Sequence, residues 1–189
     1  MIIVYGGTFN PPTIAHQKIA DKVLEVFNPD KFILLPVGDY YTWKDLHVSF
    51  KDRFTMLKLA FQDSVFEVSK LENIKTYKGT YYSLKEIYNT YKTSVYFLLG
   101  ADNLSYLDQW INYQSLIEEF EFIVLKREGF NVDEIIKRYH PHEDKFHIVE
   151  IDLNISSSAF RQNPSKHMEF IPSDVLKYII EHKLYEVKV

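Results

Sequence analysis

The sequence contains no cysteine, and this absence excludes disulfide bonds, thiolate nucleophiles and zinc sites built from thiolates. A secreted fold held together by disulfides is thereby excluded, and we expect a protein of the reducing cytoplasm. Long apolar runs are also missing. The apolar start of the chain is short and meets two glycines, Gly6 and Gly7, and no stretch approaches the roughly 18 apolar residues of a membrane helix. We therefore expect neither a signal peptide nor a membrane-spanning segment.

An excess of positive charge is absent as well. The 189 residues include 22 Lys and Arg against 26 Asp and Glu, for a formal net charge of −4. Bulk charge therefore gives no sign of a nucleic acid or an anionic membrane as a partner, and we expect neither. A small anionic ligand is still compatible with this charge, because it needs only a local positive site.

The chain is rich in hydrophobic residues, which make up 46% of it, and in aromatic residues, which make up 16%. This composition suffices for a packed core and argues against disorder. The length suits one domain, which we expect over 1–189, with about the last 30 residues as a helical C-terminal extension of it.

Continuously apolar runs alternate along the chain with segments of helical periodicity. The runs that predict strands are 2–5, 31–36, 65–68, 94–102, 120–127 and 146–151. The segments that predict helices are 14–27, 50–61, 84–91, 132–139, 155–161 and 171–185. Strands that are apolar throughout, rather than at every second residue, indicate a parallel sheet buried on both faces. We therefore predict an α/β fold with a doubly wound, Rossmann-like parallel sheet, helices on both faces and a small C-terminal helical part.

Three polar segments follow predicted strands, at 6–16, 100–102 and 155–161. Ligands of such sheets bind outside the carboxyl ends of the strands. The sequence thus predicts one ligand site to which all three segments contribute.

The first of these segments combines a glycine-rich turn with a helix start. Gly6 and Gly7 let the backbone approach a ligand closely, and the helix start offers free N–H groups and a positive dipole end. Thr13 and His16 are three residues apart and share the face of the first turn, where a histidine can donate a hydrogen bond to a phosphate. The alternative is that Thr13 only caps the helix and His16 is a surface histidine. The pattern is neither a Walker loop nor G-x-G-x-x-G.

The segment "ISSSAFR", 155–161, repeats this chemistry. Its serines supply hydroxyls and helix-start amides, and Arg161 can form paired hydrogen bonds with phosphate oxygens. The alternative is a serine cap beside an exposed arginine. Two helix starts suited to anions at one sheet edge favour phosphate binding more strongly than either does alone.

Other candidate residues would serve the remainder of a nucleotide. Asp102, directly after a strand, could accept hydrogen bonds from ribose hydroxyls or could cap a helix. Trp110 could stack on a planar ring or pack in the core. Lys44, in the irregular loop 37–48, could reach a phosphate or be solvated. The histidines fit no zinc spacing, so we expect no protein-held metal site, and the absence of G-x-S-x-G gives serine hydrolysis no support.

Several of these motifs resemble those of a known family. The stretch "GGTFNPPTIAH" is similar to the (H/T)-x-G-H signature of the nucleotidyltransferase superfamily, and "ISSSAFR" is similar to its second signature, I-S-S-[ST]-x-x-R. Within that superfamily, "LLGADNLSYLDQW" and "IPSDVLKYIIEHKLY" most resemble bacterial nicotinate-nucleotide adenylyltransferases. The resemblance spans nearly the whole chain.

The resemblance implies adenylyl transfer from ATP to nicotinate mononucleotide, giving nicotinate adenine dinucleotide and pyrophosphate in NAD biosynthesis. The mononucleotide phosphate would attack in line, without a covalent enzyme intermediate, and Mg²⁺ would be held mainly by the ATP phosphates. The implied catalytic residues are Thr13, His16 and Arg161. The implied ATP-binding residues are Gly6, Gly7, Thr8, Phe9, Thr13, His16, Ile155, Ser156, Ser157, Ser158 and Arg161. The implied mononucleotide-binding residues are Asn10, Lys44, Thr80, Gly100, Asp102 and Trp110.

Three departures from the family pattern keep alternatives open. Ala15 replaces the signature glycine, so its methyl group either crowds the nucleotide or is tolerated. Thr13 replaces a histidine that is commoner in the nicotinate branch, and threonine is usual in the pantetheine-phosphate branch. The loop before Lys44 reads "DYYTWK" rather than Pro-Pro-His-Lys. The alternatives are a pantetheine-phosphate or nicotinamide-mononucleotide adenylyltransferase, or a nucleotide-binding module that has lost turnover.

Overall fold

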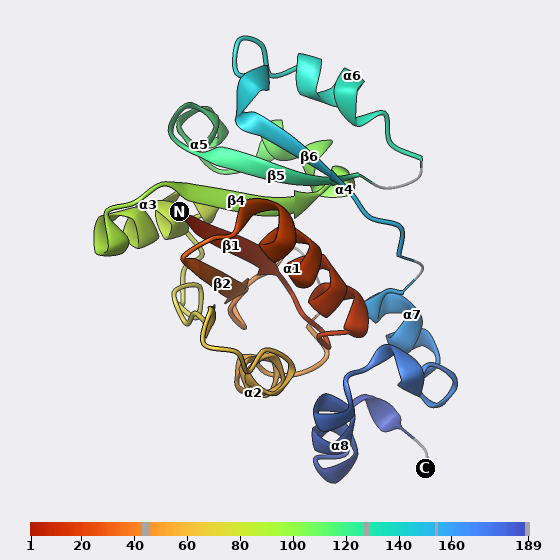
Figure 1. The fold of residues 1–189 in the computed structure, drawn as a ribbon. Helices are drawn as coiled ribbons and strands as arrows, with labels where there is room; N and C mark the ends of the chain where they lie inside the picture. Colours follow the sequence, from red (N-terminus) through yellow and green to blue (C-terminus); the bar gives the residue numbers. More distant parts are fainter. Residues whose placement is uncertain (43–45, 127–128, 154, 188–189) are drawn as a thin grey trace.

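The computed structural model describes residues 1–42, 46–126, 129–153 and 155–187. Its centre is a six-stranded sheet in the order β3-β2-β1-β4-β5-β6, in which every neighbouring pair is parallel (Figure 1). The strands are β1 (Ile2–Gly7), β2 (Lys31–Pro36), β3 (Phe66–Val68), β4 (Val95–Gly100), β5 (Glu121–Lys126) and β6 (Phe146–Glu150). Chain order reverses between β1 and β4, so the predicted doubly wound topology is confirmed and its switch point lies there.

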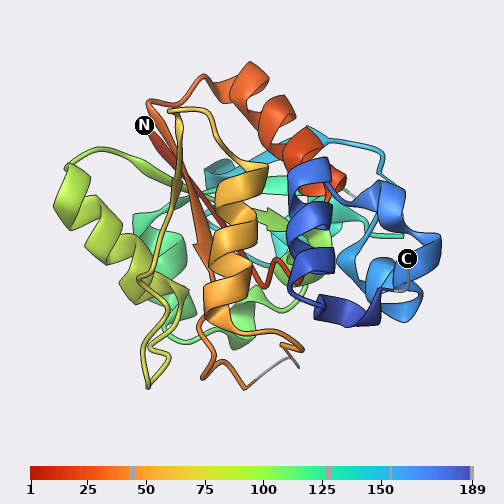
Figure 2. The same ribbon diagram turned by 90° about the horizontal axis from the view of Figure 1, so that it is seen from below.

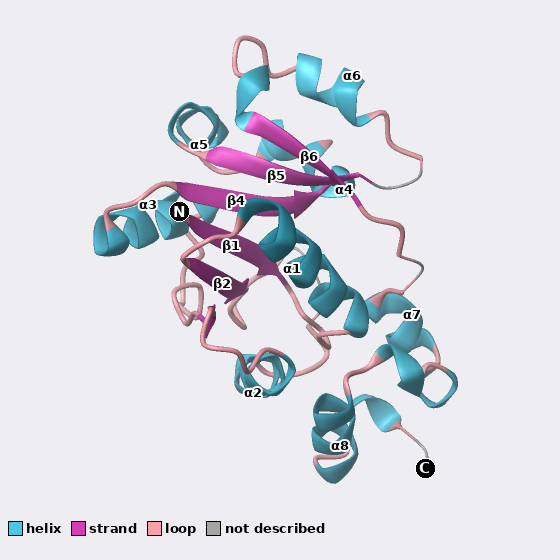
Figure 3. Ribbon diagram, in the orientation of Figure 1, coloured by secondary structure: helices cyan, strands magenta, loops and turns pink. Residues whose placement is uncertain are grey.

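Helices cover both faces of this sheet (Figure 3). They are α1 (Ile14–Phe27), α2 (Phe50–Ala60), α3 (Thr80–Tyr91), α4 (Ala101–Leu104), α5 (Tyr113–Glu119), α6 (Val132–Lys137), α7 (Ser157–Gln162) and α8 (Ser173–Glu181). None of the helices in the described residues is long and apolar enough to cross a membrane.

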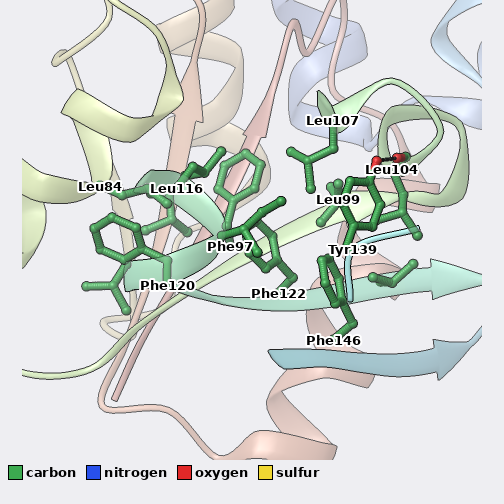
Figure 4. Close-up of a cluster of buried hydrophobic side chains, with 14 of the residues drawn as sticks. Leu84, Phe97, Leu99, Leu104, Leu107, Leu116, Phe120, Phe122, Tyr139 and Phe146 are labelled. Carbon is green, nitrogen blue, oxygen red and sulfur yellow. Dashed lines mark hydrogen bonds between the residues drawn. The ribbon is translucent and has the colours of Figure 1, made fainter. Parts of the chain in front are cut away.

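Alternate residues of the central strands β1, β2, β4 and β5 enter two separate cores, which explains why these strands are apolar throughout. Ile2 and Val4 of β1 belong to a core with Leu84 of α3 and Leu116 of α5 (Figure 4). Ile3, which lies between them, faces the opposite core together with Phe32 of β2 and Leu98 of β4. Residues of α1, α2, α7 and α8 complete that core. There α2 and α8 lie side by side (Figure 2). The C-terminal helices are therefore built onto the same sheet face as α1.

Some element bounds differ from the prediction. The last predicted helix is shorter, because α8 ends at Glu181 and a left-handed residue, Lys183 (φ 53°), follows it. The helix predicted from Leu84 begins earlier, at Thr80, after Gly79 (φ 98°). A side chain at Gly79 would also collide with Ile111, since an added Cβ would lie 2.8 Å from that side chain. The turn that starts α3 therefore requires glycine.

Candidate active site

The turn after β1 lies at the switch point of the sheet and leads directly into α1. Phe9 adopts a left-handed conformation (φ 46°), and its ring is buried, packed edge-on against Tyr5 at 5.3 Å between centroids. The peptide bond between Asn10 and Pro11 is cis. Asn10 and Thr13 are buried as well, with 1% and 0% of their surface exposed. The turn is thus a packed structure whose backbone shape is set before any ligand binds.

Thr13 and His16 contact each other at the start of α1, where Thr13 is the N-cap residue. The backbone N–H of Thr13 donates to Nδ1 of His16 at 2.9 Å, and the Thr13 hydroxyl lies 2.8 Å from the same nitrogen. Because a backbone N–H can only donate, Nδ1 must be the acceptor, and the hydrogen of the neutral imidazole is then on Nε2. The ring also packs against Phe9, at 5.2 Å between centroids. His16 is thereby held as an Nε2–H donor in one orientation.

In the predicted segment 155–161, Ser156 is the N-cap of α7, and its hydroxyl accepts from the Ala159 N–H at 3.1 Å. The Ser157 hydroxyl donates to the carbonyl oxygen of Pro11 at 2.7 Å. Arg161 donates through Nη1 to the carbonyl oxygen of Asn10 at 2.6 Å, and through Nη2 to the Ser158 hydroxyl at 3.2 Å. The two segments are therefore brought together across an interval of 151 residues, as the carboxyl-end rule predicts.

A pocket with a volume of about 320 Å³ opens beside the turn after β1. Its lining includes Gly6, Gly7 and Thr8 from that turn, and Thr80 and Trp110 from the other side of the switch point. Trp110 packs edge-on against Phe97 of β4, at 5.9 Å between ring centroids. Trp110 thus packs on the core, as one of the two alternatives predicted, and it also lines the pocket.

Other predicted residues lie elsewhere. Gly100 ends β4 and Asp102 lies in α4, and neither is among the residues that line this pocket. Ile155 is half-buried in the segment before α7. Lys44 falls outside the described residues.

Arg53 of α2 is a component of the site that the sequence did not indicate. It is fully buried, and its guanidinium donates to the carbonyl oxygen of Thr8 at 3.0 Å and to Asp39 Oδ1 at 3.3 Å. Its Nε lies 3.4 Å from the carbonyl oxygen of Val48. Burial lowers the pKa of Arg53, and the hydrogen bond with Asp39 opposes that effect. One cation thus joins the turns that follow β1 and β2.

Replacing Arg53 with methionine is expected to lower the free energy of unfolding by about 2–4 kcal/mol, because the half-buried Thr8 carbonyl and Asp39 lose their charged donor. For a chain of this length that corresponds to a fall in Tm of roughly 5–10 °C, measurable by thermal denaturation. Lys51→Met is the matched control, since Lys51 lies two residues earlier in α2 and is exposed. An equal Tm for both variants would show that Arg53 does not brace the turn.

Tyr185 is a second component without a sequence signal. Its hydroxyl donates to Oδ1 of Asn10 at 2.6 Å, and its ring packs edge-on against Phe160 of α7. Burial raises the pKa of this phenol, so Tyr185 remains a neutral donor. The segment after α8 therefore reaches back to the turn after β1.

These features define a class of protein. Residues 4–163 match the family model described as cytidylyltransferase-like, which places the chain among the nucleotidyltransferases of this fold. A curated relative from Acholeplasma laidlawii, named "Probable nicotinate-nucleotide adenylyltransferase", is 40% identical over 100% of both chains. A relative of the same name from Clostridium perfringens is 31% identical over 96% of both chains. Within the class, the chain belongs to the family of the nicotinate-nucleotide adenylyltransferases.

Solved structures agree with this assignment. The nicotinic acid mononucleotide adenylyltransferase of Plasmodium falciparum complexed with NaAD superposes with a TM-score of 0.84 at 26% identity, covering 99% of this chain and 98% of that one. The same enzyme complexed with APC gives a TM-score of 0.81 at 25% identity, with the same coverage. The predicted fold class and enzyme class are both confirmed.

Proposed function

We propose that this chain transfers the adenylyl group of ATP to nicotinate mononucleotide, forming nicotinate adenine dinucleotide and releasing pyrophosphate, as a step of NAD biosynthesis in the cytoplasm. The observation that carries the proposal is the junction of the turn after β1 with the start of α7, directly beside a pocket lined by Thr80 and Trp110. The names of the relatives and the complexes of the P. falciparum enzyme with NaAD and APC support the same two substrates.

The reaction needs no covalent intermediate. A phosphate oxygen of the mononucleotide attacks the α-phosphorus of ATP, the bond to the bridging oxygen breaks, and pyrophosphate leaves with its electron pair. The tasks of the protein are then to hold two anions in line and to stabilise the negative charge that develops on the phosphates.

His16 is proposed to donate from Nε2 to the ATP phosphates in the transition state. Thr13 acts as its positioning residue, because its N–H and hydroxyl both lie against Nδ1 and its side chain is fully buried. Because Thr13 is fully buried, we expect its identity to be a poor guide to the acceptor substrate. Positioning of this kind keeps the donor aligned without reorganisation during the reaction.

We assign the remaining ATP contacts to backbone N–H groups and to the segment 155–161. The amides of 7–9 and the start of α1 would approach the phosphates, since a helix start binds anions with its free N–H groups. Ser156, Ser158 and Arg161 would hold the β- and γ-phosphates. Asp102 is proposed to bind ribose at the end of β4.

The mononucleotide is assigned to the pocket. Trp110 would stack on the pyridine ring, and the edge-on contact with Phe97 would hold the indole in place. Thr80, at the first position of α3, would offer its hydroxyl and backbone N–H to the ring substituent. Asn10 and Lys44 are proposed to serve the phosphate of this substrate.

Mg²⁺ is proposed to arrive with ATP. The described residues contain no group of three His, Asp or Glu side chains placed to hold a metal ion. In phosphoryl-transfer sites, substrate phosphates and water supply most ligands of Mg²⁺, so such a group of side chains is not required. The ion would neutralise phosphate charge, and we assign no step to a protein-held metal.

The direct-transfer chemistry is tested by product stoichiometry. With Mg²⁺-ATP alone the enzyme should release no pyrophosphate, even in single-turnover amounts. Added nicotinate mononucleotide should then yield pyrophosphate and the dinucleotide one for one. A burst of pyrophosphate from ATP alone would instead indicate an adenylylated enzyme and would overturn the proposed mechanism.

Ala15→Gly tests whether the methyl group at the start of α1 crowds ATP. Ala15 is buried, with 5% of its surface exposed, so its methyl group is packed. We expect a KM for ATP within about twofold of the wild type and a loss of about 1 kcal/mol in stability from the poorer helix propensity of glycine. Steady-state kinetics and thermal denaturation measure both. A clear gain in kcat or a lower KM for ATP would contradict this expectation.

A further inference from the structure

The pocket assigned to the mononucleotide contains a buried carboxyl group that the reaction does not use. Glu72 lines this pocket and has 5% of its surface exposed. Its Oε1 accepts a hydrogen bond from the Ser83 hydroxyl at 3.0 Å. The backbone of Glu72 is held in place as well, because Gly38 packs against it so closely that an added Cβ would lie 2.1 Å from the Glu72 carbonyl oxygen. The carboxyl is thus fixed where it stands.

Among the residues that the structure describes, the pocket offers this carboxyl no compensating cation. The residues that line the pocket include no lysine, arginine or histidine among those described. The titratable groups that face Glu72 there are the phenols of Tyr41, from the loop after β2, and Tyr77, from the loop before α3. Burial accordingly raises the pKa of Glu72 to about 7, with the Ser83 hydrogen bond opposing the shift. Near neutral pH the carboxyl is therefore poised between its two protonation states.

The ring carboxylate of nicotinate must enter the same pocket. The pocket offers a carboxylate several donors, among them Thr80 at the first position of α3 and the side-chain amides of Asn103 and Gln109. Two carboxylates in one buried site cannot both stay ionised at low cost, and one of them takes up a proton. A protonated Glu72 removes the repulsion and can itself donate a hydrogen bond to the substrate.

We propose that Glu72 is a specificity-determining residue that accepts nicotinate mononucleotide in its protonated form, so that binding of this acidic substrate takes up a proton from solvent. A carboxamide in place of the ring carboxylate carries no charge and needs no proton. The proposal rests on the proposed function, because it assigns the ring to this pocket. It implies that the preference for the acid over the amide declines as Glu72 ionises.

The test compares nicotinate and nicotinamide mononucleotide from pH 6.5 to 8.5, using KM, or Ki where a nucleotide is not turned over. Both share a phosphate, so the ratio of their constants isolates the ring substituent. For the wild type we expect the KM of the acid divided by that of the amide to rise about 25-fold over this range, as a group of pKa near 7 loses its proton. In Glu72→Gln the ratio should be flat. Glu86→Gln, an exposed change on α3, should behave like the wild type.

Two further measurements keep the variant interpretable. Calorimetry of the wild type in buffers of different ionisation enthalpy at pH 8 should show proton uptake with the acid and none with the amide. Thermal denaturation should show the wild type losing stability relative to Glu72→Gln between pH 4.5 and 7, because the unfolded carboxyl ionises at the lower value and the folded one at the higher.

A pH-independent ratio in the wild type, or an unchanged slope in Glu72→Gln, would overturn the role of Glu72. Tighter binding of both nucleotides at higher pH would also overturn this role, because it would mean that ionised Glu72 pairs with the pyridinium ring. Failure of the proposed function has a different result, namely no turnover of nicotinate mononucleotide by any variant even at pH 6.5.

Discussion

Replacing His16 with alanine is expected to lower kcat about a hundredfold or more, because it removes a hydrogen-bond donor whose effect is greatest in the transition state. The Nδ1 atom is occupied by the Thr13 N–H, so Nε2 is the atom through which the ring can donate to a phosphate. The KM for ATP should change much less than kcat. Steady-state pyrophosphate release measures both constants.

Controls for this variant follow from its contacts. Lys18→Ala, on the exposed side of the same helix, should retain activity. His16→Gln should recover part of the loss, since its side-chain amide can donate from nearly the same place. The buried Thr13 N–H loses its acceptor in the alanine variant, so a stability cost of about 1 kcal/mol is expected as well. Wild-type kcat in a folded His16→Ala protein would remove His16 from the mechanism.

Replacing Arg161 with alanine is expected to raise the KM for ATP by roughly ten- to a hundredfold, the range for losing a charge-assisted hydrogen bond. Arg161 donates hydrogen bonds to the Asn10 carbonyl and the Ser158 hydroxyl, and this places its guanidinium between the two segments that we propose bind phosphate. The KM for the mononucleotide should stay within a few-fold. Substrate-saturation curves for each substrate separate these effects.

Arg161→Lys and Lys166→Ala are the controls for this second prediction. Lysine keeps the charge without the planar fork, so we expect a KM for ATP between those of the wild type and the alanine variant. Lys166 is an exposed cation five residues further on, and its loss should leave the KM for ATP unchanged. An unaltered KM for ATP in Arg161→Ala would contradict the phosphate-binding role of this residue.

The scaffold of the site was predictable because its determinants are local. The runs at β1 and β4 are apolar at every position, which indicates strands buried on both faces. Parallel strands then bring their carboxyl ends to one edge, which is why the turn after β1 and the start of α7 could be expected to meet. The two segments do meet, because Ser157 donates a hydrogen bond to the Pro11 carbonyl and Arg161 donates one to the Asn10 carbonyl.

Arg53, Glu72 and Tyr185 could not be found in the same way. Each owes its importance to contacts between segments far apart in the chain, such as Tyr185 with Asn10 across 175 residues. Arg53 lies in α2, and the sequence pattern alone does not distinguish it from an exposed polar residue of that helix. Glu72 lies in an irregular segment, and its burial depends on Gly38 and α3 packing around it. α4 and α5 were also missed, because helices of four and seven residues hardly display a period.

The most direct test of the central claim is pyrophosphate release from Mg²⁺-ATP with nicotinate mononucleotide, nicotinamide mononucleotide and phosphopantetheine compared side by side. A kcat/KM that clearly favours nicotinate mononucleotide is the predicted result, and it should depend on Trp110. A preference for phosphopantetheine would assign the chain to a different acceptor branch. No release with any of the three, from protein that still binds ATP, would contradict the proposed activity while leaving the fold intact.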